Sequence, residues 1–168
     1  VVVIKPLNAK WRDSGGLKRT LPADVVGMSF GLRSNTEITQ LAGCEHDYDT
    51  SRGDWFPRRN DDLETTAENV FVAGDGGGIA GVEVALAEGE IVAHRVARRL
   101  GVENLGELEQ KAARAERRVA ADRPFHDALA AWSKIRPGIF DLTTKKTVVC
   151  RCEDATLGDF AEAFDQGL

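Results

Sequence analysis

The feature that most constrains the fold is an apolar run from Asn69 to Ala73, which ends in Gly74-Asp75 and continues into a glycine-rich turn. A helix is predicted directly after the turn, over residues 80–100, because apolar side chains recur there at roughly helical spacing and Gly101 can end it. These side chains are Val82, Leu86, Ile91, Val96 and Leu100. A strand, a tight glycine turn and a helix in this order are typical of α/β proteins. The unpaired amides at the start of such a helix can receive an electron-rich ligand.

The glycine-rich turn has three interpretations. Gly76, Gly78 and Gly81 satisfy a dinucleotide-binding fingerprint, but that motif needs a second parallel strand ending in an acid about 20 residues on, and here more helix follows. In the second interpretation the glycines only allow a helix to pack tightly on a sheet. In the third, Asp75 accepts hydrogen bonds from ligand hydroxyls while the neighbouring amides face anionic or carbonyl atoms of that ligand. An acid at the end of a buried strand favours the third.

Short elements are predicted on both sides of this unit. Upstream, residues 1–5 and 17–21 are predicted to form a hairpin, and residues 25–31 a strand covered on both faces. A short helix is predicted over 36–41, with a capping box that starts at Ser34. The polar segment at 46–64 is predicted to be rich in turns and can hold a small hairpin. Those downstream are a polar helix from residue 105, a break at Pro124, a second helix whose apolar face includes Phe125, Leu129 and Trp132, then a strand from 147 and a helix from Leu157.

Composition excludes several classes of protein. Acidic residues outnumber basic ones, 27 to 22, for a net charge of -5, so nucleic acid is not an expected partner. No apolar stretch reaches the roughly 18 residues of a spanning helix, so no membrane span is predicted. The three cysteines form no disulfide framework, and a vicinal pair of thiols points to the reducing cytoplasm. The chain opens on Val1 with a strand-like run, so it reads as part of a longer protein.

A resemblance to a known family rests on several of these segments. Residues 63–75 resemble the second flavin-binding motif of two-dinucleotide-domain flavoproteins. Together with residues 29–37, 43–46, 74–81 and 148–154, they resemble the FAD-containing subunit of hetero-oligomeric amino-acid and opine dehydrogenases. Corresponding subunits occur in hydrogen cyanide synthase, opine oxidase, dye-linked proline dehydrogenase and sarcosine oxidase.

The resemblance implies an α/β fold in three parts. Residues 1–100 would be the C-terminal portion of a FAD/NAD(P)-binding domain, 101–146 a helical linker arm, and 147–168 the start of a small helical domain similar to bacterioferritin-associated ferredoxin (BFD-like). Asp75 would hold a ribityl hydroxyl of FAD, and the turn would face the isoalloxazine pyrimidine edge. The implied cofactor-binding residues are Gly74, Asp75, Gly76, Gly77, Gly78, Ile79 and Ala80. The glycine fingerprint that grips the pyrophosphate would lie upstream of Val1.

The vicinal cysteines are ambiguous without the resemblance. Cys150 and Cys152 could be partly exposed structural thiols, or two ligands of a metal centre, which normally needs four. The resemblance makes them the first two ligands of a 2Fe-2S cluster, whose second cysteine pair does not occur in this sequence. Cys44 and His46 are expected to have surface or packing roles, and His94 is expected on a solvated basic face.

The function implied is electron relay. A partner flavoprotein subunit would oxidise a C–N bond of an amino acid or opine, and electrons would pass through the cluster and FAD to an acceptor. The expected location is the cytoplasm, with peripheral membrane association only through that acceptor. The residues identify no catalytic acid or base. The alternative is a non-enzymatic piece in which residues 101–146 dock a partner subunit, while the glycine turn is only structural.

Overall fold

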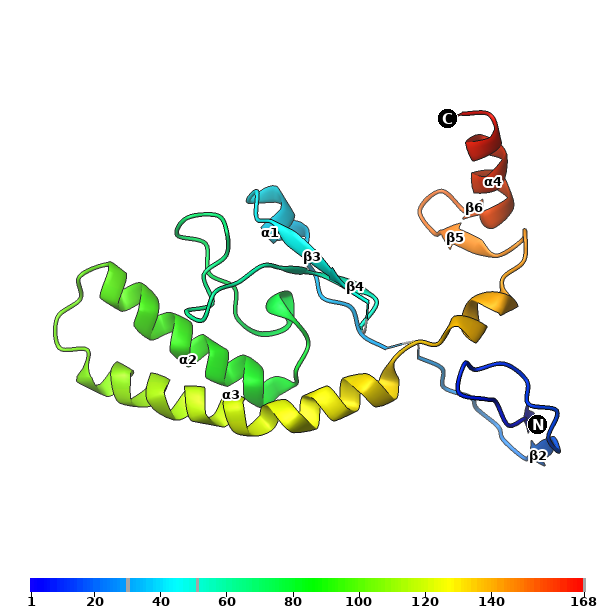
Figure 1. Cartoon of the computed structure of the whole chain (residues 1–168), viewed down its shortest axis with the longest axis horizontal. Coiled ribbons are helices and arrows are strands. Elements are labelled where there is room, and N and C mark those ends of the chain that lie inside the picture. Colours follow the sequence, from blue (N-terminus) through cyan, green and yellow to red (C-terminus); the bar gives the residue numbers. More distant parts are fainter. Residues whose placement is uncertain (30, 51, 168) are drawn as a thin grey trace. The chain divides into compact units, whose positions relative to one another are not determined.

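The chain is a mixed α/β protein that divides into two compact units. The computed structural model describes residues 1–29, 31–50 and 52–167. Unit 1 comprises Val1–Ser29 and Ile135–Leu168, and unit 2 comprises Phe30–Lys134. This mixed content is compatible with the expected α/β class, and the sheets in the described residues are short, antiparallel and two-stranded. Figure 1 shows the elements in order along the chain.

Unit 2 is built on two helices that lie side by side (Figure 1). Its core is formed by Ala87, Ile91 and Ala115, with Leu63 and Val119 packed against them. Alanine at the contact lets the two helix axes approach closely. The elements of unit 2 are α1 (Glu37–Leu41), β3 (His46–Asp49), β4 (Asp54–Pro57), the 3-10 turn η1 (Gly74–Gly77), α2 (Val82–Arg99) and α3 (Gly106–Ser133). The predicted small hairpin is confirmed as the antiparallel pair β3–β4.

Helix α2 is present as predicted, and Gly101 ends it. Gly101 has φ +70°, its amide donates to the Arg98 carbonyl, and the Val102 amide donates to the Ala97 carbonyl, which is a Schellman motif. Of the apolar side chains whose spacing predicted the helix, however, only Ile91 is buried, whereas Val82, Leu86 and Leu100 are exposed. The buried residues are Val84, Ala87, Glu88, Ile91 and His94. This face is buried because Ala87 packs on α3 and because Glu88 forms an ion pair.

The predicted break at Pro124 is also wrong, because α3 runs unbroken from Gly106 to Ser133. Proline removes one amide from the helix ladder, at a cost of about 3 kcal/mol, but does not by itself end a helix that is held elsewhere. The first half of α3 is held by Ala112 and Ala115, which are buried. The expected apolar face of Phe125, Leu129 and Trp132 is exposed.

Two predicted strands do not form. Val25, Val26 and Met28 are exposed and belong to no strand, and residue 30 lies outside the described residues. The run at 69–73 makes only an isolated bridge, between Glu64 and Phe71, although Val72 is buried. A strand needs a neighbouring strand for its backbone hydrogen bonds, and the described residues supply none for the first run and a single bridge for the second.

The capping box predicted at Ser34 is absent. The Ser34 hydroxyl is buried without a hydrogen-bond partner among the described residues, and the Ser34 amide donates to the Asp54 carboxylate at 3.0 Å. Instead, Asn35 Oδ1 accepts from the Glu37 amide at 3.3 Å. The short helix α1 follows from Glu37 as expected.

Unit 1 has the predicted N-terminal hairpin and a separate strand–turn–helix segment. The hairpin joins β1 (Val2–Ile4) and β2 (Arg19–Leu21). The later elements are η2 (Pro137–Leu142), β5 (Val148–Cys150), β6 (Ala155–Thr156) and α4 (Leu157–Asp165). Thr156 and Asp159 form a capping box that starts α4. Within unit 1, the Gly138 amide donates to the Lys10 carbonyl at 2.8 Å, and Arg12 pairs with Asp141.

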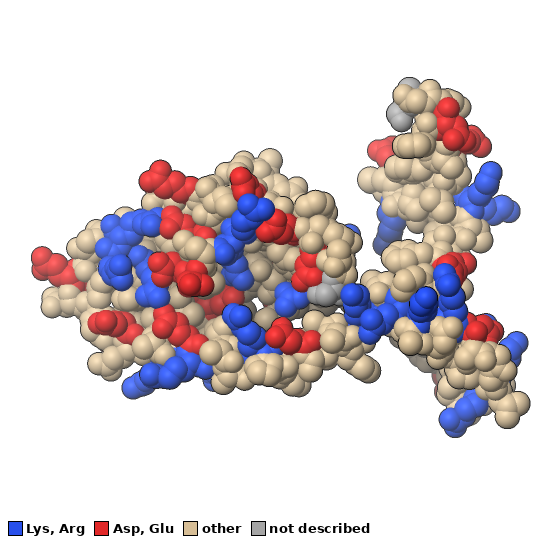
Figure 2. All heavy atoms as spheres, viewed as in Figure 1, with Lys and Arg blue, Asp and Glu red and all other residues tan. Residues whose placement is uncertain are grey.

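Acidic and basic side chains are interspersed on the face of unit 2 drawn in Figure 2. Among the described residues, no helix has the length and apolar character needed to cross a bilayer.

Candidate functional site

The glycine-rich turn folds as η1, which leads through residues 78–81 into α2. Its first residue, Gly74, is buried with φ +68°, a conformation that side-chain-bearing residues rarely adopt. The next residue, Asp75, is exposed, and none of the described residues donates a hydrogen bond to its carboxylate. The Asp75 carbonyl accepts from the Gly78 amide at 3.2 Å and closes the turn. The Asp75 carboxylate is therefore free to bind a ligand.

Most glycines of the turn have a structural reason of their own. A Cβ at Gly77 would lie 2.3 Å from the Arg59 guanidinium, and Gly78 and Gly81 have φ of +133° and +84°. Gly76 differs, because a Cβ there would meet only Val72 Cγ1 at 3.5 Å and the Asn35 carbonyl at 3.8 Å, which are ordinary contacts. Packing therefore accounts for the glycine at 77, backbone conformation accounts for those at 78 and 81, and neither accounts for Gly76.

A buried ion pair holds the turn against α2. Arg59 Nη1 donates to the Val72 carbonyl at 2.7 Å and to Glu88 Oε2 at 3.1 Å, while Nη2 donates to the Gly77 carbonyl at 3.0 Å. Glu88 Oε2 also accepts from the Gly74 amide at 2.7 Å. The side chains of Arg59 and Glu88 are 16% and 10% exposed. We call these two residues the Arg59–Glu88 clamp, because together they contact both ends of η1.

Sequence reasoning missed the clamp. The one available signal was position, since Glu88 lies four residues after Val84 and three before Ile91, on the buried face of α2. A carboxylate on a buried helix face requires a cation or hydrogen-bond donors. Nothing in the sequence identifies Arg59 as that partner, because it lies 29 residues away in a loop.

The N-terminus of α2 is open at the turn. Its first intrahelical bond runs from the Ala85 amide to the Gly81 carbonyl at 3.0 Å. The amides of Val82, Glu83 and Val84 therefore have no partner within the helix, and no side chain caps them in the described chain. An 18-residue helix carries partial positive charge at this end. The Asp75 carboxylate can therefore accept a hydrogen bond from a ligand hydroxyl. The N-terminal end of α2 favours a negatively charged group of that ligand.

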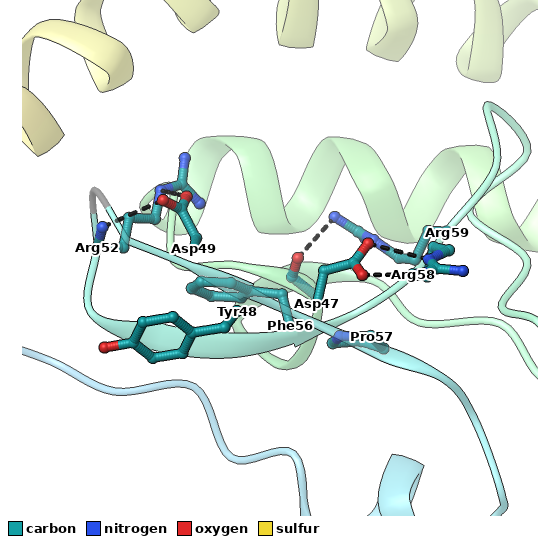
Figure 3. A pocket seen from close by; sticks show the side chains of 9 residues that line it. Asp47, Tyr48, Asp49, Arg52, Phe56, Pro57, Arg58 and Arg59 are labelled. Carbon is teal, nitrogen blue, oxygen red and sulfur yellow. Dashed lines mark hydrogen bonds and ion pairs between the residues drawn. The ribbon is translucent and has the colours of Figure 1, made fainter.

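A cavity of about 420 Å³ adjoins the turn on the side of the β3–β4 hairpin (Figure 3). Four of its charged side chains form two pairs: Arg58 Nη2 binds Asp47 at 2.6 Å, and Arg52 lies 3.7 Å from Asp49. The hydrogen bond from Arg58 lowers the pKa of Asp47 below its usual value. The lining residues are Asp47, Tyr48, Asp49, Arg52, Phe56, Pro57, Arg58, Arg59 and Gly77. Gly77 thus belongs both to the turn and to the cavity wall.

Asp54 fixes the segment before α1 to the hairpin. Its carboxylate accepts from Arg33 Nη2 at 2.8 Å, from the Ser34 amide at 3.0 Å and from the Trp55 amide at 3.0 Å. Burial alone acts to raise the pKa of Asp54, but these hydrogen bonds together bring it below its usual value. Asp54 is therefore a charged structural anchor, and its carboxylate is fully engaged.

The structure brings Cys150 and Cys152 together. Their Sγ atoms lie 3.0 Å apart, at the end of β5 and in the turn that follows. The hydrogen bond with Cys152, and next the Glu153 amide, lower the pKa of the Cys150 thiol. The described part of the chain contains no group of three or more His, Cys, Asp or Glu side chains that could hold a metal. The donor set is thus two soft sulfur ligands, half of what a 2Fe-2S cluster requires.

The other residues considered from sequence are structural. Cys44 is buried and its Sγ donates to Thr65 Oγ1 at 3.2 Å, which agrees with a packing role. The His46 ring bonds the Thr39 hydroxyl and the Cys44 carbonyl. His94 is buried at 5% exposure, so its expected place on a solvated face is wrong. Its Nδ1 lies 3.0 Å from Arg95 Nη1.

Curated relatives match the chain over nearly its whole length. Hydrogen cyanide synthase subunit HcnB of Pseudomonas protegens is 28% identical over 168 residues, which are 100% of this chain and 36% of the relative. An opine oxidase subunit of Rhizobium meliloti is 33% identical over 90% of this chain and 32% of its own length. The corresponding opine oxidase subunit of Agrobacterium tumefaciens is 30% identical over 89% of this chain and 30% of its own. The chain therefore spans about a third of these relatives. No protein-family model and no solved structure matches the chain.

Proposed function

The chain is homologous to hydrogen cyanide synthase subunit HcnB and to a subunit of opine oxidase, as the sequence motifs predicted, and on this premise we propose that it is the flavin-contacting part of an oxidoreductase subunit. The ligand of the turn is FAD. The observation that carries the proposal is the exposed Asp75 carboxylate, which has no partner among the described residues and lies in the turn that leads into the uncapped N-terminus of α2.

Each part of the turn has a role toward FAD. The Asp75 carboxylate accepts a hydrogen bond from a ribityl hydroxyl, and the backbone from Gly76 to Ala80 faces the pyrimidine edge of the isoalloxazine. Gly76 lacks a side chain without needing the space for packing, which suits close approach of a ring to its backbone. The partial positive charge of α2 favours the reduced, anionic flavin and thereby tunes its potential. When bound, FAD supplies the capacity to take electrons in pairs and release them singly.

The two vicinal cysteines carry the second part of the proposal. Cys150 and Cys152 provide two of the four sulfur ligands of a 2Fe-2S cluster. The distance of 3.0 Å between their Sγ atoms supports this, because the two sulfurs already lie side by side. A partner flavoprotein subunit oxidises a C–N bond of an amino acid or opine, and the electrons reach an acceptor through the cluster and FAD.

The alternative is a subunit-docking piece without redox function. Two observations favour it: Phe125 and Trp132 of α3 are exposed, and packing or backbone conformation accounts for Gly77, Gly78 and Gly81. Exposed aromatic side chains on a helix are common anchors of protein interfaces. This reading predicts no cofactor at the turn.

A visible spectrum separates the two proposals. We define the long polypeptide as one of the relatives' length that contains residues 1–168. We expect the purified long polypeptide to show flavin bands and broad iron–sulfur absorption, with FAD in its acid extract. The 168-residue chain alone is expected to hold less than one FAD per chain, because the resemblance assigns the pyrophosphate contacts to residues before Val1. A colourless long polypeptide would rule out the relay and leave the docking piece.

A further inference from the structure

We propose that Cys150 and Cys152 are a thiol–disulfide exchange site, which closes to a reversible disulfide with a low-molecular-weight disulfide as oxidant. The proposal rests on the position of these two thiols, whose Sγ atoms lie 3.0 Å apart, and on the exposure of Cys152. The inference concerns the metal-free chain and does not depend on the flavin proposal.

The geometry needs only a small adjustment to close the bond. A disulfide has an S–S length of about 2.05 Å, so the two Sγ atoms must approach by roughly 1 Å. The backbone there is irregular, because the pairing of β5 with β6 shifts register between Val148 and Cys150. Residues 151–154 form a turn, in which Asp154 has φ +51°. A turn beside a register shift can absorb this movement without breaking a regular strand ladder.

Exposure decides the order of the two exchange steps. Cys152 is exposed and Cys150 is half-buried. The Cys152 thiolate attacks one sulfur of the small disulfide RS–SR, which forms a mixed disulfide and releases one thiol, RSH, after protonation. The Cys150 thiolate then attacks Cys152 Sγ, which forms the internal S–S bond and releases the second RSH. Two protein thiols are oxidised, one RS–SR is reduced, and the two thiol protons leave on the two RSH molecules.

The resulting disulfide is expected to be easily reduced. The loop that it closes contains a single residue, Arg151, so the bond removes little entropy from the unfolded chain. A disulfide that gains little stability from the fold has a comparatively oxidising potential and exchanges readily. In the oxidised form neither sulfur is a thiolate, so the same pair cannot ligate a metal until it is reduced.

Cys44 provides an internal control for this reactivity. It is 7% exposed, and its Sγ donates a hydrogen bond to Thr65. A buried thiol in such a site is poorly accessible to a small disulfide. Exchange in the native chain should therefore involve only Cys150 and Cys152, with Cys44 still reduced.

The test uses the 168-residue chain, purified without metal and incubated in mixtures of oxidised and reduced glutathione. Acid quenching, alkylation after unfolding and peptide mass spectrometry then locate each thiol. We expect a species that is two hydrogens lighter, with neither Cys150 nor Cys152 alkylated and Cys44 alkylated. The glutathione adduct should stay below roughly a tenth of this species, because the second step is intramolecular. Added dithiothreitol should restore all the thiols.

The single variants make the result decisive. In Cys150→Ser the remaining Cys152 should accumulate the glutathione adduct, because no second thiol resolves it, and circular dichroism should match that of the unchanged chain. Accumulation of the adduct in the unchanged chain without the lighter species would overturn the proposal. So would oxidation of Cys44 before the pair, or thiols that stay reduced at every glutathione ratio.

Discussion

Replacing Asp75 with alanine is expected to weaken FAD binding by the long polypeptide by roughly tenfold to a hundredfold. A hydrogen bond to a charged group contributes about 1.5–3 kcal/mol, and each 1.4 kcal/mol changes a dissociation constant tenfold. The Asp75 carboxylate is exposed and has no partner among the described residues, so its removal should leave the fold intact. Titration of the flavin-free protein with FAD, followed by flavin fluorescence, measures the dissociation constant.

Two further variants make this prediction specific. Asp61 is also an exposed aspartate of unit 2, outside the turn, and Asp61→Ala should leave FAD affinity unchanged. Gly76→Ala introduces a methyl group that the surrounding protein can accommodate, since its nearest neighbour would lie at 3.5 Å. It should therefore leave thermal stability nearly unchanged but weaken FAD binding. Equal FAD affinities for Asp75→Ala, Gly76→Ala and the unchanged polypeptide would mean that the turn does not contact the flavin.

The largest loss of stability is expected from Glu88→Ala, which removes one half of the Arg59–Glu88 clamp. The variant leaves a guanidinium that is 16% exposed without its carboxylate, and it leaves the Gly74 amide without an acceptor. Breaking one partner of a buried ion pair costs about 3–5 kcal/mol in free energy of unfolding. Urea denaturation of the 168-residue chain, followed by far-ultraviolet circular dichroism, reports on this change because most of its helix is in α2 and α3.

A surface ion pair of the same unit is the matched control. Arg58 Nη1 binds Glu45 Oε2 at 2.6 Å, but the Glu45 side chain is 63% exposed. Glu45→Ala should therefore cost less than about 1 kcal/mol. Glu88→Gln keeps an oxygen that can accept from the Gly74 amide, so its loss should lie between those of the two alanine variants. Indistinguishable losses for Glu88→Ala and Glu45→Ala would show that the clamp does not hold η1 in place.

Local patterns predicted the elements whose signals lie close together in sequence. Helix α2 was predicted because its periodicity and Gly101 are both local, and the Schellman motif at Gly101 uses hydrogen bonds within a few residues. The helix from Leu157 was predicted for the same reason, and its capping box needs only Thr156 and Asp159. The hairpin at β3–β4 is likewise formed by neighbouring segments.

Features that depend on distant residues were missed. The buried face of α2 is set by α3 and by Arg59, so periodicity alone selected Val82 and Leu86, which are exposed. A Cβ at Gly77 would collide with the Arg59 guanidinium, and no sequence pattern shows this contact. The apolar run at 25–31 predicted a buried strand, but Val25 and Met28 are exposed. A strand forms only where a neighbouring strand can pair with it, and the local sequence does not show whether one is present.

Hydrogen exchange at the turn is the most direct test of the central claim that Asp75 and the following amides hold FAD. Exchange of the amides from Gly76 to Val84 is measured in the long polypeptide, with and without FAD. We predict that FAD slows exchange in this segment, because ligand contact shields amides that have no partner in the helix. Stoichiometric FAD binding that leaves exchange from Gly76 to Val84 unchanged would contradict the account.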